Sequence, residues 1–288
     1  MVQKDRWAIS FFAGDSPLQL VPLAGVEHPV LSAAMVTDVP AEFIADPFLL
    51  RHEEQWYLFF EVLNRRSGRG EIGLATSSDG RSWQYGGIVL AEAIHLSYPF
   101  VFAWQGEIYM VPESIAAREV RLYRASDFPR RWEPVGRLLT GDRLSDPTLL
   151  HRDGRWWLFA RGAKHSLVLY HAESLTGPWQ EHPRSPLLRE DLSRTRPAGR
   201  VIEANGRLLR FAQDGLPWYG HRVLAFEITE LTPHSYREQP IEEPVLAASG
   251  LGWNRDGMHH LDAHLLGDGS WLAAVDGFSK YWTFSPSW

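Results

Sequence analysis

The amino-acid sequence predicts an all-β fold, a β-propeller of five blades. The 288 residues include 13 Trp, 9 Tyr and 14 Phe, which favour strands, beside 24 Gly and 19 Pro, which interrupt strands with turns. The second observation is a repeat, because an apolar run, a short polar turn and a second apolar run follow one another five times. No amphipathic helical period separates these runs, which excludes an alternating α/β fold.

Each repeat is typical of a β-hairpin. The five hairpins are ADPFLL-RHEEQ-WYLFFE, YPFVF-AWQGE-IYMVPE, DPTLL-HRDGR-WWLFAR, AGRVI-EANGR-LLRFAQ and LDAHLL-GDGS-WLAAVD. Three turns contain Asp153-Gly154, Asn205-Gly206 and Asp268-Gly269, dipeptides that tolerate positive φ at both centres of a two-residue type I′ turn. With Glu53-Glu54 and Gln105-Gly106 aligned to them, the turns recur at intervals of about 50 residues, so each hairpin begins one unit.

Two further strand-like runs follow the earlier hairpins, and four strands per unit make one propeller blade. Between these two runs an aromatic residue recurs, which we expect to pack between neighbouring blades: Trp83, Trp132, Trp179 and Tyr236. The fifth unit ends one strand short, with KYWTF as its third strand. Residues 6–32 contain strand-like runs without a hairpin, so we expect them to complete the fifth blade and close the ring, which removes free strand edges. No linker divides residues 1–288, which predicts one domain.

The composition limits the possible partners and compartments. The chain has 29 Lys and Arg against 35 Asp and Glu, and a net charge of −6 argues against binding to nucleic acid. It has no Cys, which excludes disulfides, thiolate metal sites and Cys nucleophiles. The absence of a signal-peptide core and of a long apolar stretch predicts a soluble, cytoplasmic protein with no membrane span.

The hairpin registers place a polar residue at the open end of every second strand. Counting back from each turn gives five facing pairs: Asp46 with Glu61, Tyr98 with Glu113, Asp146 with Arg161, Ala198 with Gln213 beside Asp214, and Leu261 beside Asp262 with Asp276. If the first two strands are the inner ones, these ends surround one mouth of the central channel. A single Asp-Pro pair would mark only a strand start, but five charged ends favour a functional funnel.

Three arginines are candidates for contact with an anionic group. The guanidinium groups of Arg161, Arg196 and Arg200 match a phosphate or a carboxylate in shape and charge. The stretch SRTRPAGR, which contains the last two, is equally compatible with a solvated loop.

A metal or water on the propeller axis is a further hypothesis. His260 and Asp262 alternate with His264 onto one face of a strand, where imidazole and carboxylate could be ligands, although a lone His is more often packed in a core. No other cofactor is expected. Most of the Trp residues are predicted core, whereas Trp218 and Trp253 fall outside the repeat and are candidates for ligand contact.

A set of short motifs forms a combination that is specific to one family. They are ADPF, WYLFFE, GEIGLATSSDGRSW, HLSYPFVF, GEIYMVPES, RLYRASDFP, GPW, RPAGR and RFAQD with a following YG. In these motifs, over residues 40–240, the chain resembles the N-terminal domain of plant glucosamine inositolphosphorylceramide transferases and its bacterial relatives. More distantly, the Asp-Pro blade starts and TGPW resemble the arabinanase, levansucrase and invertase superfamily of five-bladed propellers.

The distant resemblance implies roles for individual carboxylates. In that superfamily an Asp of the first blade is the base or nucleophile, a second Asp tunes the acid, and a Glu protonates the leaving group. Asp46 matches the first role and Asp146, in LSDP, resembles the second. The expected place of the Glu reads RPAGR here, so Glu113 or Glu61 would have to substitute, and neither matches by motif.

Two functions stay open at this point. One is a carbohydrate-active enzyme that hydrolyses or transfers a glycosyl unit, with two carboxyl groups flanking the bond. The other is a sugar-binding module for a glycosyltransferase partner, because the resemblance ascribes sugar transfer to a separate C-terminal domain. The clustered acids narrowly favour the enzyme. Both functions place a sugar or glycoconjugate in the funnel, in contact with the arginines and with Tyr98, Asp214, Trp218, His260 and Asp276.

Overall fold

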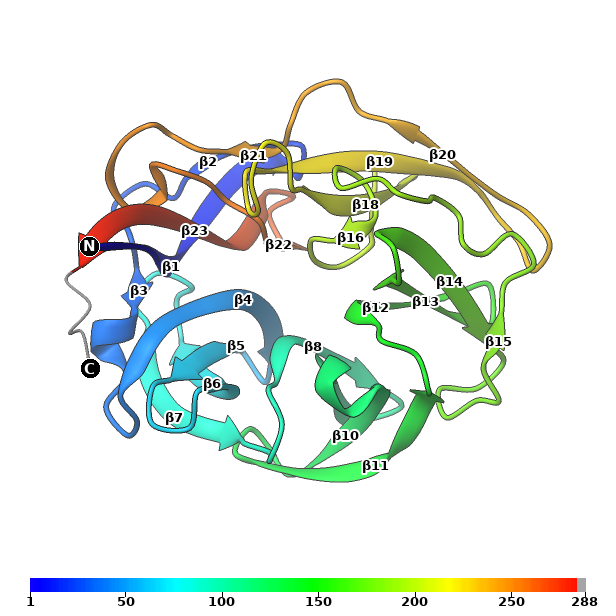
Figure 1. Cartoon of the computed structure of the whole chain (residues 1–288), viewed down its shortest axis with the longest axis horizontal. Helices are drawn as coiled ribbons and strands as arrows, with labels where there is room; N and C mark the ends of the chain where they lie inside the picture. The colour runs from blue at the N-terminus through cyan, green and yellow to red at the C-terminus, as the bar shows by residue number, and fades with distance from the viewer. Residues whose placement is uncertain (284–288) are drawn as a thin grey trace.

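The computed structural model describes residues 1–283, and it arranges them as a ring of five β-sheets around a central axis (Figure 1). Each sheet is one blade, so the predicted five-bladed propeller is confirmed. The helices of this part of the chain are short 3-10 turns: η1 (Ala33–Met35), η2 (Ile115–Ala117) and η3 (Gly252–Asn254). Within residues 1–283, no helix has the length and apolar character needed to cross a membrane.

Blades 1 to 3 are four-stranded antiparallel sheets whose first strand is innermost (Figure 1). Blade 1 consists of β4 (Ala41–His52), β5 (Gln55–Asn64), β6 (Arg69–Ser77) and β7 (Gln84–Leu90). Blade 2 consists of β8 (Ser97–Trp104), β9 (Glu107–Glu113), β10 (Glu119–Asp127) and β11 (Arg131–Thr140). Blade 3 consists of β12 (Ser145–Arg152), β13 (Arg155–Gly162), β14 (Ser166–Ala172) and β15 (Gln180–Glu181).

Blades 4 and 5 are less regular. Blade 4 has a divided inner strand, and its strands are β16 (Arg196–Pro197), β17 (Ile202–Ala204), β18 (Arg207–Asp214), β19 (Arg222–Leu231), β20 (Tyr236–Pro240) and β21 (Leu246–Ala247). Blade 5 combines both parts of the chain, from the inner strand outward: β22 (Leu261–Leu265), β23 (Trp271–Thr283), β1 (Val2–Ser16) and β2 (Gln19–Pro22), with β3 (Leu31–Ser32) beside β1.

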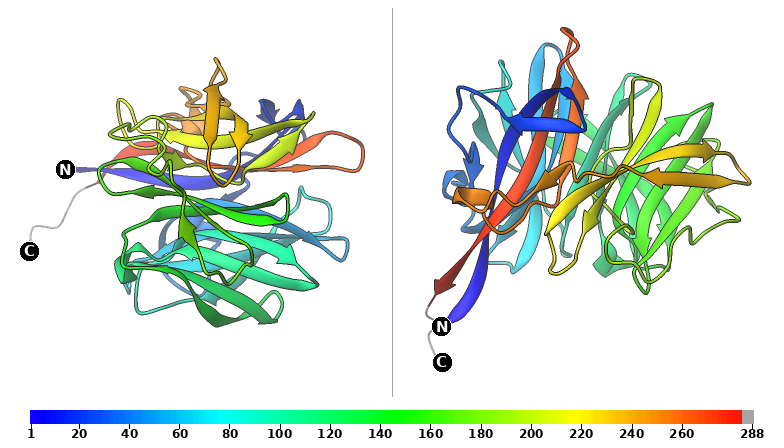
Figure 2. Two further views of the ribbon diagram at one scale, coloured as in Figure 1. Left: turned by 90° about the vertical axis from the view of Figure 1, so that its right-hand side faces the viewer. Right: turned by 90° about the horizontal axis from the view of Figure 1, so that it is seen from above.

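The closure of the ring by N-terminal strands is confirmed, with one correction. The run KYWTF is not a separate third strand, because its residues up to Thr283 continue β23, while Phe284 lies outside the described residues. Strand β1 pairs with β23 without interruption from Val2 opposite Thr283 to Gly14 opposite Trp271 (Figure 2). The N-terminal segment therefore supplies both outer strands of blade 5.

The recurring aromatic residues join neighbouring blades, as predicted. The Trp83 ring stacks on Phe11 of blade 5 with centroids 4.7 Å apart. The Trp132 ring meets Phe59 of blade 1 edge-on at 5.5 Å. Such contacts fill the space between sheets with apolar surface, whose burial is the main force that holds the ring together.

The registers near the turns are as predicted in blades 1 to 3, but they change at the open ends. In blade 1 Phe48 pairs with Phe59, whereas Ala45 rather than Asp46 pairs with Glu61. Corresponding shifts put Ser97 opposite Glu113 and Ser145 opposite Arg161. Each shift is a bulge at an X-Pro pair, because proline has no N–H with which to continue the ladder.

The predicted facing pairs of blades 4 and 5 are also corrected. Gln213 pairs with Arg196 rather than Ala198, because irregular backbone separates β16 from β17. In blade 5 Leu261 pairs with Val275 rather than Asp276. The reason is a turn of three residues, 267–269, instead of two, since the Leu266 N–H donates to the Ser270 carbonyl oxygen.

Candidate functional site at the mouth of the propeller

Three residues at the mouth share a left-handed backbone conformation that is costly for any residue except glycine. Asp46, Tyr98 and Asp146 have φ values of 53°, 47° and 52°, and each precedes the proline of its bulge. A non-glycine residue in this region costs of order 1–3 kcal/mol, and such strain collects at functional sites. The bulges also turn the amide N–H groups of these residues away from their own blade.

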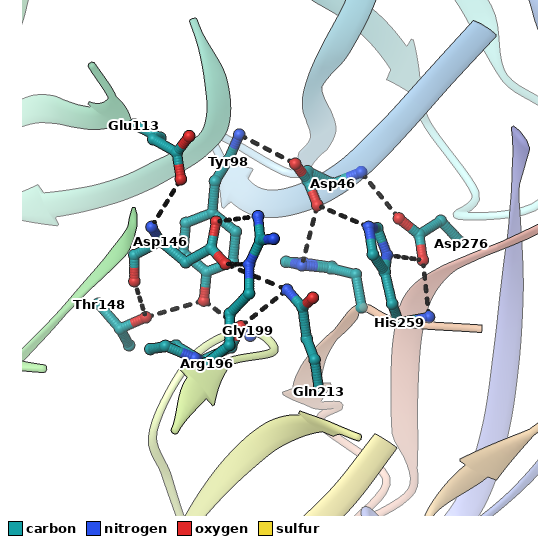
Figure 3. A network of polar contacts seen from close by, with 12 residues as sticks. Asp46, Tyr98, Glu113, Asp146, Thr148, Arg196, Gly199, Gln213, His259 and Asp276 are labelled. Carbon is teal, nitrogen blue, oxygen red and sulfur yellow. Dashed lines mark hydrogen bonds and ion pairs between the residues drawn. The ribbon is translucent and has the colours of Figure 1, made fainter. Parts of the chain in front are cut away.

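Carboxylates accept all three of these N–H groups (Figure 3). The Asp46 N–H donates to Asp276 Oδ2 at 2.9 Å, and the Tyr98 N–H donates to Asp46 Oδ2 at 3.3 Å. The Asp146 N–H donates to Glu113 Oε2 at 3.0 Å. In each case the carboxylate belongs to the preceding blade of the ring. These acids therefore tie neighbouring blades together.

Asp276 is the most heavily used acceptor of the group. Its Oδ1 accepts the His259 backbone N–H at 3.2 Å and lies 2.8 Å from His259 Nδ1 (Figure 3). The other ring nitrogen, His259 Nε2, lies 3.8 Å from Asp46 Oδ1. His259 is a site residue that was not predicted, because it lies one residue before the predicted pair of His260 and Asp262 and outside their alternation. It links two carboxylates that belong to blades 5 and 1.

The crowding of buried acids alters the protonation of the site. Burial, and then the nearby carboxylates of Asp146 and Glu61, raise the pKa of Asp46 well above its usual value. Burial and the adjacent Asp146 raise the pKa of Glu113 to about 8. Burial opposes ionisation of Asp276 too, but the His259 ring outweighs it and lowers the pKa of Asp276. The acids therefore divide into proton-holding and ionised groups.

Asp146 faces the basic side of the mouth. Arg196 donates to its carboxylate through Nε and through Nη2, the latter at 3.3 Å, and Gln213 Nε2 donates to it at 3.1 Å (Figure 3). The Arg196 guanidinium lies over the ring of Tyr219, 5.1 Å from the centroid. Tyr219 was not predicted from the sequence. It lies in the irregular segment between β18 and β19, where no hairpin repeat identifies it.

A pocket of about 230 Å³ opens on this basic side. Its lining residues are Arg161, Leu192, Thr195, Arg196, Gln213, Gly215 and Tyr219. Asp46, Glu113 and Asp146 do not line it, and they are 5%, 7% and 0% exposed. Asp46, Glu113 and Asp146 are thus linked at one mouth through backbone contacts, but these acids lie inside the ring whereas Arg161 and Arg196 face the pocket.

Other predicted contact residues are engaged within the protein. The Tyr98 side chain is buried, and its hydroxyl accepts the Gly199 N–H at 2.7 Å. Asp214 pairs with Arg222 at 2.7 Å, and Glu61 Oε1 lies 3.1 Å from His95 Nε2. None of these three predicted residues lines the pocket.

Arg200 and Asp262 form an ion pair of 3.0 Å along the inner strands. Asp262 Oδ2 also accepts the Leu49 N–H at 2.7 Å and lies 3.1 Å from His264 Nε2. His260 packs edge-on against Phe48, with centroids 4.7 Å apart, and burial lowers its pKa to about 4. A metal at His260 and Asp262 stays a prediction. The Asp262 carboxylate already has partners within the protein, namely Arg200, the Leu49 N–H and His264.

A different group fulfils the geometric condition for metal ligation. Asp46, His259 and Asp276 each offer a ligand atom, and these atoms lie within 4.8 Å of one another. Both oxygens of Asp276 already accept N–H groups, and Asp46 holds its proton strongly. Metal ligands must be deprotonated, so this donor set fits a hydrogen-bonded network better than a metal.

The two predicted tryptophans differ in their surroundings. Trp218 is 42% exposed, donates to the Asp256 carbonyl oxygen at 3.0 Å and lies under Lys280, 4.8 Å from the ring centroid. Trp253 lies in η3 and packs against the apolar core of blades 4 and 5. Trp218 therefore keeps an exposed face, whereas Trp253 is a packing residue.

Comparison with known proteins identifies relatives over nearly the whole chain. The family model described as glucosamine inositolphosphorylceramide transferase 1, N-terminal, matches residues 2–278. Proteins with the name glucosamine inositolphosphorylceramide transferase 1 from Oryza sativa subsp. japonica and Arabidopsis thaliana are 39% and 37% identical to the chain. These matches cover 94% of this chain but 40% and 39% of the relatives, so the chain spans about two fifths of their length.

Solved structures share the fold. An α-L-arabinanase of Cellvibrio cellulosa in complex with arabinohexaose matches with a TM-score of 0.59 and 16% identity, over 82% of this chain and 90% of that chain. The GH43 protein BlXynB of Bacillus licheniformis matches with a TM-score of 0.57 and 18% identity, over 80% of this chain and 49% of that chain.

Proposed function

The chain belongs to the family of glucosamine inositolphosphorylceramide transferase 1 N-terminal domains, and from this premise we propose that it binds the carbohydrate part of a glycoconjugate. The binding site is the pocket on the basic side of the mouth. The observation that carries this proposal is the separation of the acids from the open pocket, which leaves donors and an aromatic ring to meet a ligand.

The pocket has the chemistry of a sugar site. Arg161 and Arg196 offer guanidinium donors for hydroxyl groups, and Gln213, which is only 2% exposed at the floor of the pocket, has an amide oxygen without a hydrogen-bond partner among residues 1–283. Tyr219 is 48% exposed and presents an aromatic ring with a polar tip, a combination that suits an amphipathic sugar face. A few convergent polar groups in a concave site are the usual basis of small-molecule recognition.

The relatives are named as transferases, and this chain covers only about two fifths of their length. We therefore place the binding function in the service of a glycosyltransferase, to which the propeller presents a glycoconjugate. The inositolphosphorylceramide in the relatives' name makes a membrane glycolipid headgroup the first candidate ligand.

Catalysis at the acids is the second candidate function. The pKa of Glu113 near 8 suits a general acid that protonates a leaving group, and strongly shifted acids are common in active sites. Asp46 fits the base or nucleophile role poorly, because its raised pKa keeps the proton that a base has to lack. Turnover would also require the mouth to open around side chains that are almost fully buried.

Saturation-transfer NMR with myo-inositol, glucosamine and glucose tests the binding proposal. We expect at least one sugar to bind the parent protein, and Gln213→Ala and Tyr219→Ala to weaken binding about tenfold. Tyr57→Ala is the matched control and should leave binding unchanged, because Tyr57 lies near the turn between β4 and β5, at the end of the hairpin away from the mouth. Absence of binding, or equal losses in all three variants, contradicts the proposal.

An assay with aryl glycosides separates the second candidate from the first. The binding proposal predicts no turnover by the parent protein. If the parent cleaves a glycoside and Glu113→Gln abolishes cleavage while sugar binding persists, catalysis replaces pure binding as the function.

A further inference from the structure

Arg161 differs from the other arginines near the inner strands in its charge balance. Several of them form ion pairs with a buried carboxylate: Arg196 with Asp146, Arg200 with Asp262, Arg210 with Glu238, and Arg222 with Asp214. Within residues 1–283, no carboxylate lies within ion-pair distance of Arg161. Its guanidinium contacts His165 Nδ1 through Nη2, and an imidazole carries no negative charge that could balance it.

The surroundings of Arg161 concentrate positive charge. Arg161 stands at the end of β13, opposite Ser145 and beside the Asp146 bulge, and its side chain is half-buried. Burial, together with the neighbouring Arg196, lowers the pKa of the Arg161 guanidinium. The Asp146 carboxylate balances the charge of Arg196, because the two form a direct ion pair. One positive charge is left without a partner at the pocket.

The pocket gives this charge access to a ligand. Both arginines line it, and its lining includes no Asp or Glu. Arg196 bonds Asp146 through Nε and Nη2, so Nη1 is the donor that it retains for a ligand. A guanidinium matches an oxyanion with two parallel N–H bonds, and such charge-assisted bonds are stronger than those to a neutral hydroxyl.

We propose that Arg161, with Arg196 beside it, forms an oxyanion subsite that binds a phosphate or carboxylate group carried by the sugar ligand. This inference rests on the proposed sugar-binding function and narrows its ligand to an anionic sugar. The oxyanion lies at the arginines, and the sugar ring lies toward Gln213 and Tyr219, which line the same pocket.

Three probes that share one ring and differ at a single carbon test the subsite. Glucose is neutral, glucuronate carries a carboxylate and glucose 6-phosphate carries a phosphate, while inorganic phosphate tests the anion alone. Calorimetric titration at constant ionic strength should give at least about tenfold tighter binding of one charged sugar than of glucose, which corresponds to about 1.4 kcal/mol. The stronger of the two charged sugars identifies the oxyanion.

Variants connect that preference to Arg161. Arg161→Gln should reduce the affinity for the charged sugar to that for glucose, and Arg161→Lys should recover only part of the loss, because a point charge lacks the planar fork. Arg131→Gln, an 80% exposed side chain on the outer strand β11, is the control and should leave the preference intact. Circular dichroism and thermal melts verify that each variant is folded.

Three results would overturn the subsite. They are equal affinities for glucose and both charged sugars, a preference that survives Arg161→Gln, and inorganic phosphate binding that is as tight as that of the charged sugars and insensitive to Arg161→Gln. Tight binding of a neutral sugar with no anion preference would reject the subsite and leave the sugar-binding function standing.

Discussion

The two sides of the propeller mouth carry opposite charges and use them differently. On the acidic side Asp46 and Asp276 are buried and accept backbone N–H groups from neighbouring strands. On the basic side Arg161 is half-buried and lines an open pocket without a carboxylate partner among residues 1–283. Charged residues at equivalent ends of the blades therefore serve two purposes, because one set holds the ring together and the other is free to meet a ligand.

The largest effect is expected from removal of an acid that joins two blades. Asp276→Ala takes the acceptor from the Asp46 N–H and from the His259 N–H, and both donors stay buried. We expect the free energy of unfolding to fall by about 3 kcal/mol, since an unsatisfied buried donor costs about 1–3 kcal/mol. Urea unfolding measures this change.

Asp268→Ala, in the exposed turn of the same blade, is the control and should change stability by less than about 0.5 kcal/mol. If the two variants are equally stable, Asp276 does not tie the blades together.

The second largest effect is expected in the pH dependence of the free energy of unfolding, through Glu113. The pKa of Glu113 rises from the ordinary 4.5 to about 8 on folding, so between these pH values the folded state binds more protons than the unfolded state. The stabilising contribution of its proton is complete below about pH 4.5 and is lost as the pH rises to about 8. Asp46 acts in the same direction because its pKa is also raised.

Glu113→Gln should remove part of this decline, because an amide does not titrate and its oxygen still accepts the Asp146 N–H. Unfolding curves recorded from pH 5 to pH 8 compare the variant with the parent, and Glu54→Gln, on the exposed turn of blade 1, is the control. Parallel profiles of the parent and Glu113→Gln would show that Glu113 is not protonated preferentially in the folded state.

A smaller effect is expected at Asp46. Its carboxyl group holds a proton strongly, so Asp46→Asn replaces it with a neutral group of similar shape that still accepts the Tyr98 N–H. We expect stability to change by less than about 1 kcal/mol near neutral pH and to increase relative to the parent at higher pH. A loss as large as that of Asp276→Ala would place an ionised Asp46 in the network.

The smallest effect on stability belongs to the basic side. Arg161→Gln breaks no ion pair of the described chain, so we expect the free energy of unfolding, measured by thermal denaturation, to change by less than about 0.5 kcal/mol. Arg196→Gln should cost several times more, because it leaves the buried Asp146 without its cation. Equal losses in the two variants would remove the distinction between structural and ligand-facing arginines.

The fold could be predicted because repetition carries its signal. The hairpin turns recur with a common spacing, and the aromatic residues between the outer strands recur with them. A strand assignment that is ambiguous in one unit is therefore supported by the same pattern in the other units. The predicted pairing of Asp46 with Glu61 was wrong for a local reason. The Pro47 ring interrupts the ladder, and a bulge shifts Ala45 and Ile44, which precede it, by one position, whereas Phe48 to His52 keep the predicted register.

The site was predicted less completely for a physical reason. The hairpin registers brought Asp46, Glu113, Asp146 and Arg161 to one mouth, but they do not say which side chain pairs with which across blades. His259 and Tyr219 come from irregular segments where no repeat constrains them. Such contacts depend on how the ring closes, and this information is distributed over the whole sequence.

A crystal structure of the protein soaked with glucose 6-phosphate tests the central claim most directly. The account predicts the phosphate within hydrogen-bond distance, about 2.7–3.2 Å, of Arg161 and Arg196, with the sugar ring beside Tyr219 and the acids still bonded to the blade amides. A sugar bound instead between Asp46 and Glu113, with Arg161 free of the ligand, would contradict it and assign the acids to chemistry.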